Sequence, residues 1–264
     1  MQRNDRGGGK LSQAERHAQI LTLLRREGAV QIAGLAKTFH VTTETARRDL
    51  DELAERGAIK RTYGGAANRS LIDEPAIGER ERTRSAQRSR VAARAAGLVE
   101  PGDALMIDCG STTSLFAEAL AARGLHLTIV TNGLGVATAL GQVESCRVVL
   151  CPGNYVAREG GLYGADTVAF LGRFKANKAF IGAGGLTPEG VTDADSLGCA
   201  IKRAMIERAE RVLLLVDSAK FGAGQFERVC GIEALDDVVC EAPPPRDLAL
   251  ALRGNGVRVT VAKG

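Results

Sequence analysis

Residues 45–66 read TARRDLDELAERGAIKRTYGGA, and this stretch decides the fold of the first part of the chain. Its apolar residues recur at the spacing of one helical face and are predicted to be buried: Ala46, Leu50, Leu53 and Ala54. Arg47 and Arg48 then lie on another face of the helix. Thr42 or Thr43 can cap the helix by accepting a backbone N–H of its open first turn.

Two further helices are predicted upstream. QIAGLAKTF has apolar residues at helical spacing: Ile32, Leu35, Ala36 and Phe39. The helix before it, in QAERHAQILTLLRREG, has an apolar face through Ala14, Ala18, Leu21 and Leu24, with Ile20 beside them, and ends at Gly28. Downstream, AIKRTYGGAA predicts a short hairpin that turns at Gly64–Gly65 and carries two cations. This order of elements is that of a winged helix-turn-helix.

A helix-turn-helix suggests a role for the exposed polar residues. Residues 43–45 can reach base edges, while Arg47 and Arg48 can bind phosphate or the O6/N7 edge of guanine. The alternative is that both arginines only balance Asp49, Asp51, Glu52 and Glu55 on a solvated surface. The neighbouring helix, the cap and the basic hairpin favour DNA. The predicted DNA-binding residues are Thr42, Thr43, Glu44, Thr45, Arg47, Arg48, Lys60, Arg61 and Tyr63.

Charge and composition exclude other classes. Residues 1–95 hold 19 Lys and Arg against 12 Asp and Glu, a net charge of +7, whereas residues 96–264 carry −3. A basic first third favours a polyanionic partner. The six cysteines form no CxxC pair and the three histidines are scattered, so we expect reduced thiols, no metal site and no cofactor. No secretory signal is recognised, and the longest apolar run, RVLLLVD, is too short to span a bilayer.

From Ala104 onward, β-rich runs alternate with helical stretches. This alternation predicts an α/β domain with a mostly parallel sheet that helices cover on both faces. Ligands of such sheets bind beyond the carboxyl ends of the strands. The tail, residues 242–264, is expected to add a last helix and strand to the sheet.

Polar residues follow several of the predicted strands. In MIDCGSTTSLFAEAL a strand runs through glycine and hydroxyl residues into a helix, which is suited to binding an anion. An ordinary capped turn and a surface lysine are the alternatives for these residues taken singly. Together they favour a phosphate-bearing small molecule. The predicted effector-binding residues are Asp108, Gly110, Ser111, Thr112, Thr113, Thr131, Asn132, Lys202 and Lys220.

The predicted organisation has four parts. Residues 1–12 form a disordered tail, and residues 13–68 form the winged helix-turn-helix, with the helix-turn-helix itself at 30–49. Residues 69–85, which mix charges with poor periodicity, form a linker. Residues 86–264 form the effector-sensing α/β domain. Arg84, Arg88, Arg90 and Arg94 could contact DNA, but a solvated helix face is favoured for them.

The segment from ERHAQILTLLRREG to TARRDLDELAERGAIKRTYGGA resembles the DNA-binding domain of the DeoR family of bacterial transcription regulators. DCGSTT, VTNG, AFIGAGGL, KRAM and VDSAKFG resemble the family's effector domain. The resemblance implies a fold like that of ribose-5-phosphate isomerase and the CoA transferases, and a phosphorylated sugar or sugar derivative as effector. The chain departs from the family where acidic residues are common, at Asn177-Lys178 and at Gly198, and it has Gly153-Asn154 in place of a Gly-Gly pair.

Three functions remain open on the sequence. A DNA-binding regulator, with repression implied by the resemblance, is favoured over an isomerase-like enzyme, because aldose–ketose isomerisation needs a carboxylate base and NKAFIGAGGL contains none. A constitutive regulator with a degenerate pocket is the third. The predicted partners are a double-stranded DNA operator, the effector, and further copies of the chain in a homodimer or homotetramer, with no membrane. The predicted location is the cytoplasm, at the nucleoid.

Overall fold

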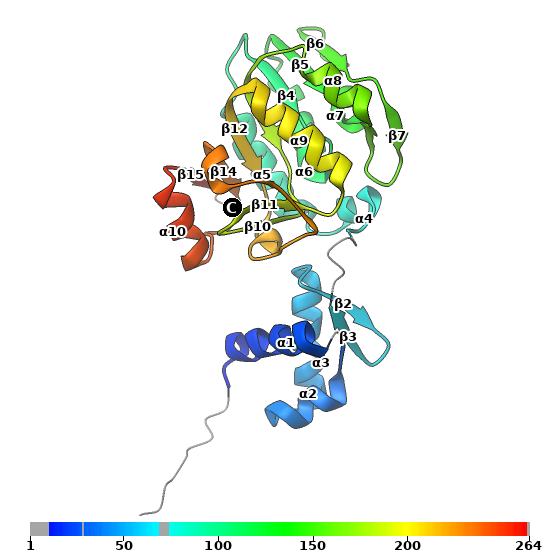
Figure 1. Ribbon diagram of the computed structural model, residues 1–264, viewed down its shortest axis with the longest axis vertical. Helices are drawn as coiled ribbons and strands as arrows, with labels where there is room; N and C mark the ends of the chain where they lie inside the picture. The colour runs from blue at the N-terminus through cyan, green and yellow to red at the C-terminus, as the bar shows by residue number, and fades with distance from the viewer. Residues whose placement is uncertain (1–10, 28, 69–73, 263–264) are drawn as a thin grey trace, which may run out of the picture. The chain divides into compact units, whose positions relative to one another are not determined.

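The computed structural model describes residues 11–27, 29–68 and 74–262, and the chain forms two compact units, Met1–Ser70 and Leu71–Gly264 (Figure 1). Of the tail predicted over residues 1–12, residues 1–10 lie outside the described part. The same holds for residues 69–73 of the predicted linker.

The first unit packs three helices against a small antiparallel sheet in its described part. The elements are α1 (Gln13–Glu27), β1 (Ala29–Gln31), α2 (Ile32–Phe39), α3 (Thr43–Glu55), β2 (Ile59–Thr62) and β3 (Gly65–Asn68), with strand order β1-β3-β2. The expected faces of α2 and α3 are buried, with Ala54 only partly so. His40, in the left-handed conformation, ends α2 and starts the tight turn to α3.

Two details of this unit differ from the sequence prediction. On α1, Ala14 and Ala18 are exposed, and the buried face runs through His17, Ile20 and Leu24. A buried histidine displaces the stripe because its polar ring meets a polar partner on α3 rather than water. Strand β1 was not predicted, since three residues are too few to show an alternating pattern.

The second unit is built on a sheet of seven parallel strands. Its strand order is β15-β14-β12-β9-β4-β5-β6, and every neighbouring pair is parallel. The strands are β4 (Ala104–Ile107), β5 (Leu127–Thr131), β6 (Cys146–Leu150), β9 (Ala176–Ile181), β12 (Ala209–Leu215), β14 (Asp237–Cys240) and β15 (Arg258–Val261). The predicted α/β fold is therefore confirmed, and the tail supplies a helix and an edge strand.

Helices cover both faces of this sheet (Figure 1). The helices are α5 (Ser85–Ala96), α6 (Ser111–Ala121) and α7 (Leu134–Leu140) on one face, and α8 (Ala165–Leu171), α9 (Ser196–Arg208) and α10 (Arg246–Gly254) on the other. Successive strand residues alternate between the two cores: Met106 packs on one side, and Leu105 and Ile107 on the other. Phe116 stacks on Phe180 with ring centroids 4.3 Å apart.

Short antiparallel strands complete the unit. They are the pair β7 (Asn154–Val156) and β8 (Gly161–Tyr163), and the sheet of β10 (Gly185–Thr187), β11 (Gly190–Asp193) and β13 (Glu227–Cys230). In the described residues, no helix has both the length and the apolar character that crossing a membrane requires.

The segment predicted as a linker is shorter than expected. Residues 74–85 belong to the second unit and contain α4 (Ile77–Arg82). Arg84 binds Asp217 and Glu241 at 3.1 and 2.9 Å, and Arg88 is buried. The prediction that these two arginines lie on a solvated helix face is therefore wrong. Ion pairs hold this segment in place. Helix α4 has no apolar stripe, so a search for hydrophobic periodicity could not detect it.

Candidate functional site

The start of α3 is rigidly capped. Thr42 accepts a hydrogen bond from the backbone N–H of Thr45 at 3.1 Å, and the two hydroxyls lie 2.9 Å apart. Of the two candidate caps, Thr42 therefore fills the role, and Thr43 and Glu44 are left exposed in the first turn. The cap satisfies one of the backbone N–H groups of the open first turn and so stabilises the start of the helix.

Arg47 and Arg48 lie on the exposed face of α3. Their side chains are 57% and 75% exposed, and both pair with Glu44 at 3.4 Å. Ion pairs this exposed contribute about 0–1 kcal/mol, so exchanging them for a phosphate or a base edge costs little. Of the four acids that the arginines could balance, Asp49 has other partners, on α1.

Asp49 joins α3 to α1 in the interior of the first unit. It accepts two hydrogen bonds from Arg16, from Nε at 2.7 Å and from Nη2 at 2.9 Å, and His17 Nε2 lies 3.2 Å away. Burial alone would raise the pKa of Asp49, but its bonds to Arg16, with the nearby His17, hold it below the ordinary value. The ion pair between Arg16 and Asp49 therefore fixes the orientation of α3 relative to α1.

Replacing Asp49 with Asn is expected to destabilise the first unit by about 1.5–3 kcal/mol, the size of a hydrogen bond to a charged group. Because the folded pKa of Asp49 is depressed, its contribution is present above its unfolded pKa near 3.8 and is lost as the pH falls below that value. Hydrogen exchange of α1 and α3 amides measures the effect. Asp51→Asn, which removes a half-exposed carboxylate from the same helix, is the matched control; an equal loss there would contradict the assignment.

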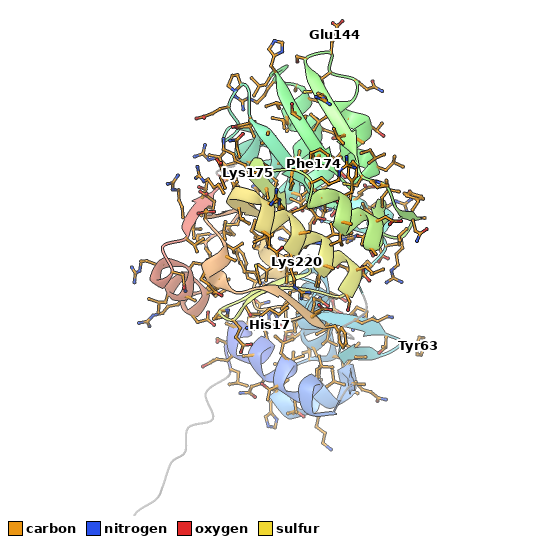
Figure 2. The ribbon with its side chains drawn as sticks, turned by 45° about the horizontal axis from the view of Figure 1, so that its top comes forward. His17, Tyr63, Glu144, Phe174, Lys175 and Lys220 are labelled. Carbon is orange, nitrogen blue, oxygen red and sulfur yellow. The ribbon has the colours of Figure 1, made fainter. Side chains whose placement is uncertain are left out.

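The hairpin β2–β3 forms the predicted wing. Tyr63 projects fully into solvent at its tip, as Figure 2 shows. Gly64 has φ of +75°, and a Cβ on Gly65 would lie 2.0 Å from the carbonyl oxygen of Val30, so the Gly-Gly turn lets β3 pair with β1. Arg61 is partly exposed; it pairs with Asp51 of α3 at 2.9 Å and donates to the carbonyl of Gly65.

The predicted effector-binding residues gather at the carboxyl edge of the parallel sheet. Asp108 follows β4, and Gly110 leads into the first turn of α6, where no side chain caps the open N–H groups of residues 111–113. Asn132 follows β5, and Lys220 lies in a short 3-10 turn, Ser218–Lys220, after β12.

Three of these residues use their side chains within the protein. Thr113 donates to the carbonyl of Gly110, and Thr131 donates to that of Ile107 while accepting from Gly133 N–H. Asn132 accepts from Cys109 N–H at 3.1 Å and donates to Leu162. Because Thr113, Thr131 and Asn132 are also fully buried, they hold the loops in position, while Ser111 and Thr112 keep uncommitted hydroxyls among the described contacts.

Lys202 is buried between two carboxylates. Its Nζ lies 3.1 Å from Asp108 and 3.0 Å from Asp193, which closes β11. Burial by itself would lower the pKa of Lys202, but the two aspartates outweigh it and raise that pKa well above the ordinary value. The ammonium group therefore stays charged and fully compensated, which makes this cluster a partner for hydroxyls rather than for phosphate.

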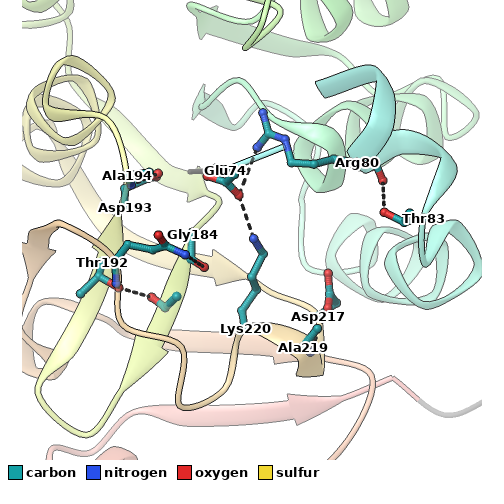
Figure 3. A network of polar contacts seen from close by, with 12 residues as sticks. Glu74, Arg80, Thr83, Gly184, Thr192, Asp193, Ala194, Asp217, Ala219 and Lys220 are labelled. Atoms are coloured by element: carbon teal, nitrogen blue, oxygen red, sulfur yellow. Dashed lines mark hydrogen bonds and ion pairs between the residues drawn. The ribbon is translucent and has the colours of Figure 1, made fainter. Parts of the chain in front are cut away.

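Four further charged residues at this edge were missed: Glu74, Arg80, Glu159 and Asp193. Arg80 binds Glu159 at 2.6 Å, and Glu74 binds Lys220 at 2.8 Å (Figure 3). Glu74 and Arg80 come from the predicted linker, where nothing in the pattern of the sequence marks them. The charges of Asp193 and Lys202 influence the pKa of Glu159, so the two groups of charges are neighbours.

The carboxyl edge does contain carboxylates, contrary to the expectation from NKAFIGAGGL. Asn177 and Lys178 lie at the amino end of β9, where Lys178 pairs with Asp103 at 2.6 Å, so their identity does not bear on a ligand at the carboxyl edge. Asp195 supplies an acid close to Gly198 by capping α9 at 2.8 Å. The carboxylates of the edge come from other segments, and the choice between sensor and enzyme must rest on other grounds.

Comparison with known proteins supplies those grounds. Residues 16–70 match the model of the DeoR-like helix-turn-helix domain, and residues 83–242 match that of the DeoR C terminal sensor domain. The chain belongs to the DeoR family of transcription regulators. It is 34% identical over 250 residues to the glycerol-3-phosphate regulon repressor of Escherichia coli K12, covering 94% of this chain and 99% of that one.

A second DeoR-family relative supports the same function. The chain is 29% identical to the HTH-type transcriptional repressor GlcR of Bacillus subtilis, covering 95% of this chain and 97% of that one. Among solved structures, ribose 5-phosphate isomerase A of Methanocaldococcus jannaschii matches with 20% identity and a TM-score of 0.37 over 50% of this chain and 52% of that one. The family assignment makes the protein a DNA-binding regulator and not an isomerase.

Proposed function

We propose that this protein represses transcription by placing α3 in the major groove of operator DNA. A small phosphorylated sugar or polyol, the effector, changes its affinity for that DNA. The observation that carries the proposal is the capped α3 with Arg47 and Arg48 exposed on its outer face. Thr43, Glu44 and Thr45 face base edges at its start, and Thr42 holds the cap. Lys60, Arg61 and Tyr63 of the wing contact the DNA backbone beside it.

The effector binds at the carboxyl edge of the parallel sheet. Its phosphate lies against Lys220 and the open first turn of α6, with the hydroxyls of Ser111 and Thr112 as donors. Its hydroxyl groups are bound by Asp108, Asp193 and Lys202, a cluster in which two carboxyl groups share one ammonium group. The relatives named for the glycerol-3-phosphate regulon make sn-glycerol 3-phosphate the first ligand to test.

The assembly is a homodimer or homotetramer that places two α3 helices in successive major grooves, about 34 Å apart. The protein works in the cytoplasm, at the nucleoid. The effector shifts operator occupancy by its difference in affinity between two states, commonly about 1–3 kcal/mol. Titration of promoter fragments from the protein's own locus, with and without sn-glycerol 3-phosphate, tests the proposal. Absence of binding at modest ionic strength would overturn it.

Replacing Lys220 with Gln is expected to weaken binding of sn-glycerol 3-phosphate by about 10- to 100-fold, since a hydrogen bond to a charged group contributes about 1.5–3 kcal/mol. Isothermal calorimetry measures the change. Lys175→Gln, which removes an exposed lysine before β9, is the control and should bind as the wild type does. Equal affinities for wild type and Lys220→Gln would remove Lys220 from the site.

A further inference from the structure

Glu74 places a buried carboxylate among the cations of the effector site. It is only 6% exposed, and its Oε1 lies 2.8 Å from Lys220 Nζ and 3.6 Å from Arg80 Nη1. Figure 3 shows the carboxylate between the two cations. A carboxylate held by a lysine and an arginine has the environment that proteins provide for a phosphate group.

Arg80 has binding capacity that its present partners do not use. Its Nη2 donates to Glu159 at 2.6 Å, but its Nε is buried with no hydrogen-bond partner within the described part of the chain. A buried unpaired guanidinium N–H is costly, so Arg80 is suited to an additional acceptor. A phosphate, with three acceptor oxygens, can offer one where a single carboxylate does not.

The charges of this cluster balance while Glu74 is in place. Four carboxyl groups (Glu74, Glu159, Asp108 and Asp193) face four cations: Arg80, Arg158, Lys202 and Lys220. A phosphate added to this set would be repelled by the carboxylate of Glu74. Withdrawal of Glu74 leaves three carboxyl groups and four cations, and it frees Lys220 for the incoming anion.

Glu74 precedes α4, so it can withdraw while Arg80, on α4, stays in place. Arg88 anchors α4 by donating to the backbone carbonyl of Arg80. The residues around Glu74 are held by polar contacts. The backbone carbonyl of Glu74 accepts from Arg158, and Ile77 N–H donates to the carbonyl of Arg158 at 2.7 Å. In the chain, Glu74 follows Asn68, the last residue of β3, by six positions.

We propose that Glu74 is a tethered competitor that occupies the phosphate subsite formed by Lys220 and Arg80, and that the effector binds by displacing it. This inference rests on the proposed function, because it concerns the regulation of the same site. Arg80 becomes a ligand of the effector phosphate. Displacement of Glu74 is the local change by which effector binding alters the segment that leads into the first unit.

Calorimetry on the full chain tests this competition, with sn-glycerol 3-phosphate and inorganic phosphate as probes. Glu74→Gln, which keeps the shape and removes the charge, is expected to bind both probes about tenfold more tightly than the wild type. Glu74→Asp keeps the charge and should remain close to the wild type, which separates competition from loosening of the segment. Glu159→Gln removes a neighbouring charge that touches Arg80 but not Lys220, and it measures the general electrostatic effect.

The outcomes separate the inference from the proposed function. Competition is supported if Glu74→Gln binds the probes more tightly than the wild type and neither Glu159→Gln nor Glu74→Asp does. It is also supported if the wild type binds neither probe and Glu74→Gln alone among the variants binds them. Equal gains in Glu74→Gln and Glu159→Gln, or in Glu74→Gln and Glu74→Asp, overturn the inference, as does unchanged affinity in Glu74→Gln. If the wild type still binds in a Lys220-dependent manner, the proposed function stands. Binding of neither probe by wild type or Glu74→Gln overturns phosphate sensing together with the inference.

Discussion

Replacing Arg47 and Arg48 together with alanine is expected to abolish measurable operator binding at physiological salt. Each arginine that reads a base contributes about 1–3 kcal/mol, and removing a cation that binds a DNA phosphate also reduces the salt dependence of binding. Both side chains are exposed and pair only weakly with Glu44, so the fold should not change. Fluorescence anisotropy with a promoter fragment from the protein's own locus, over a range of salt concentrations, measures the effect.

Arg56→Ala provides the control for this result. Arg56 is an equally exposed arginine that follows α3 and pairs with Glu52 at 3.6 Å, so it tests the removal of a positive charge near the same helix away from its start. We expect a small, sequence-independent decrease in affinity. If the double variant behaves as Arg56→Ala does, α3 does not read the operator with these residues.

Replacing Lys202 with Met is expected to destabilise the second unit by about 3–5 kcal/mol. The substitution leaves Asp108 and Asp193 facing each other without a counter-charge, and uncompensated buried charge carries a cost of that size. Urea denaturation followed by circular dichroism measures the loss of stability. A triple variant, Lys202→Met with Asp108→Asn and Asp193→Asn, removes all three charges and should recover most of the stability.

The destabilisation in Lys202→Met should also depend on pH. Burial raises the pKa of Asp108, and Lys202 opposes that effect. Without the lysine, the folded pKa of Asp108 lies further above the unfolded value near 3.8, so stability is highest below that value and falls as the pH rises. The destabilisation should therefore be smaller at pH 4 than at pH 7. A pH-independent effect, or a triple variant no more stable than Lys202→Met, would show that packing accounts for it.

The sequence predicted features that depend on neighbours in the chain. Leu50 and Leu53 are buried on α3 as their spacing requires, and the Gly64–Gly65 turn closes the hairpin. The parallel sheet follows from alternating β-rich and helical segments. Because strand ends share one edge of such a sheet, Asp108 and Lys220 could be assigned to the effector site from the sequence, and that assignment stays a prediction.

Prediction failed where charges replace apolar contacts. His17 displaces the buried face of α1, and Arg88 is buried although a basic residue on a helix usually faces water. Glu74 and Arg80 come from a segment with no hydrophobic period, so a search for periodicity assigns it to a linker. In each case the residue type predicted a solvent-exposed side chain. A partner of opposite charge or a hydrogen bond instead stabilises that side chain in a buried position.

The sequence by itself determined the three helices and the hairpin of the first unit and the alternation of strands and helices in the second, because helical period, turn chemistry and strand alternation act between residues close in the chain. Only the tertiary structure decided which charges are paired. Arg16 and Asp49 are 33 positions apart, and Glu74 and Lys220 are 146 apart. A buried charge needs a partner of opposite charge. Which charges meet depends on how segments distant in the sequence pack together, and no local sequence pattern contains that information.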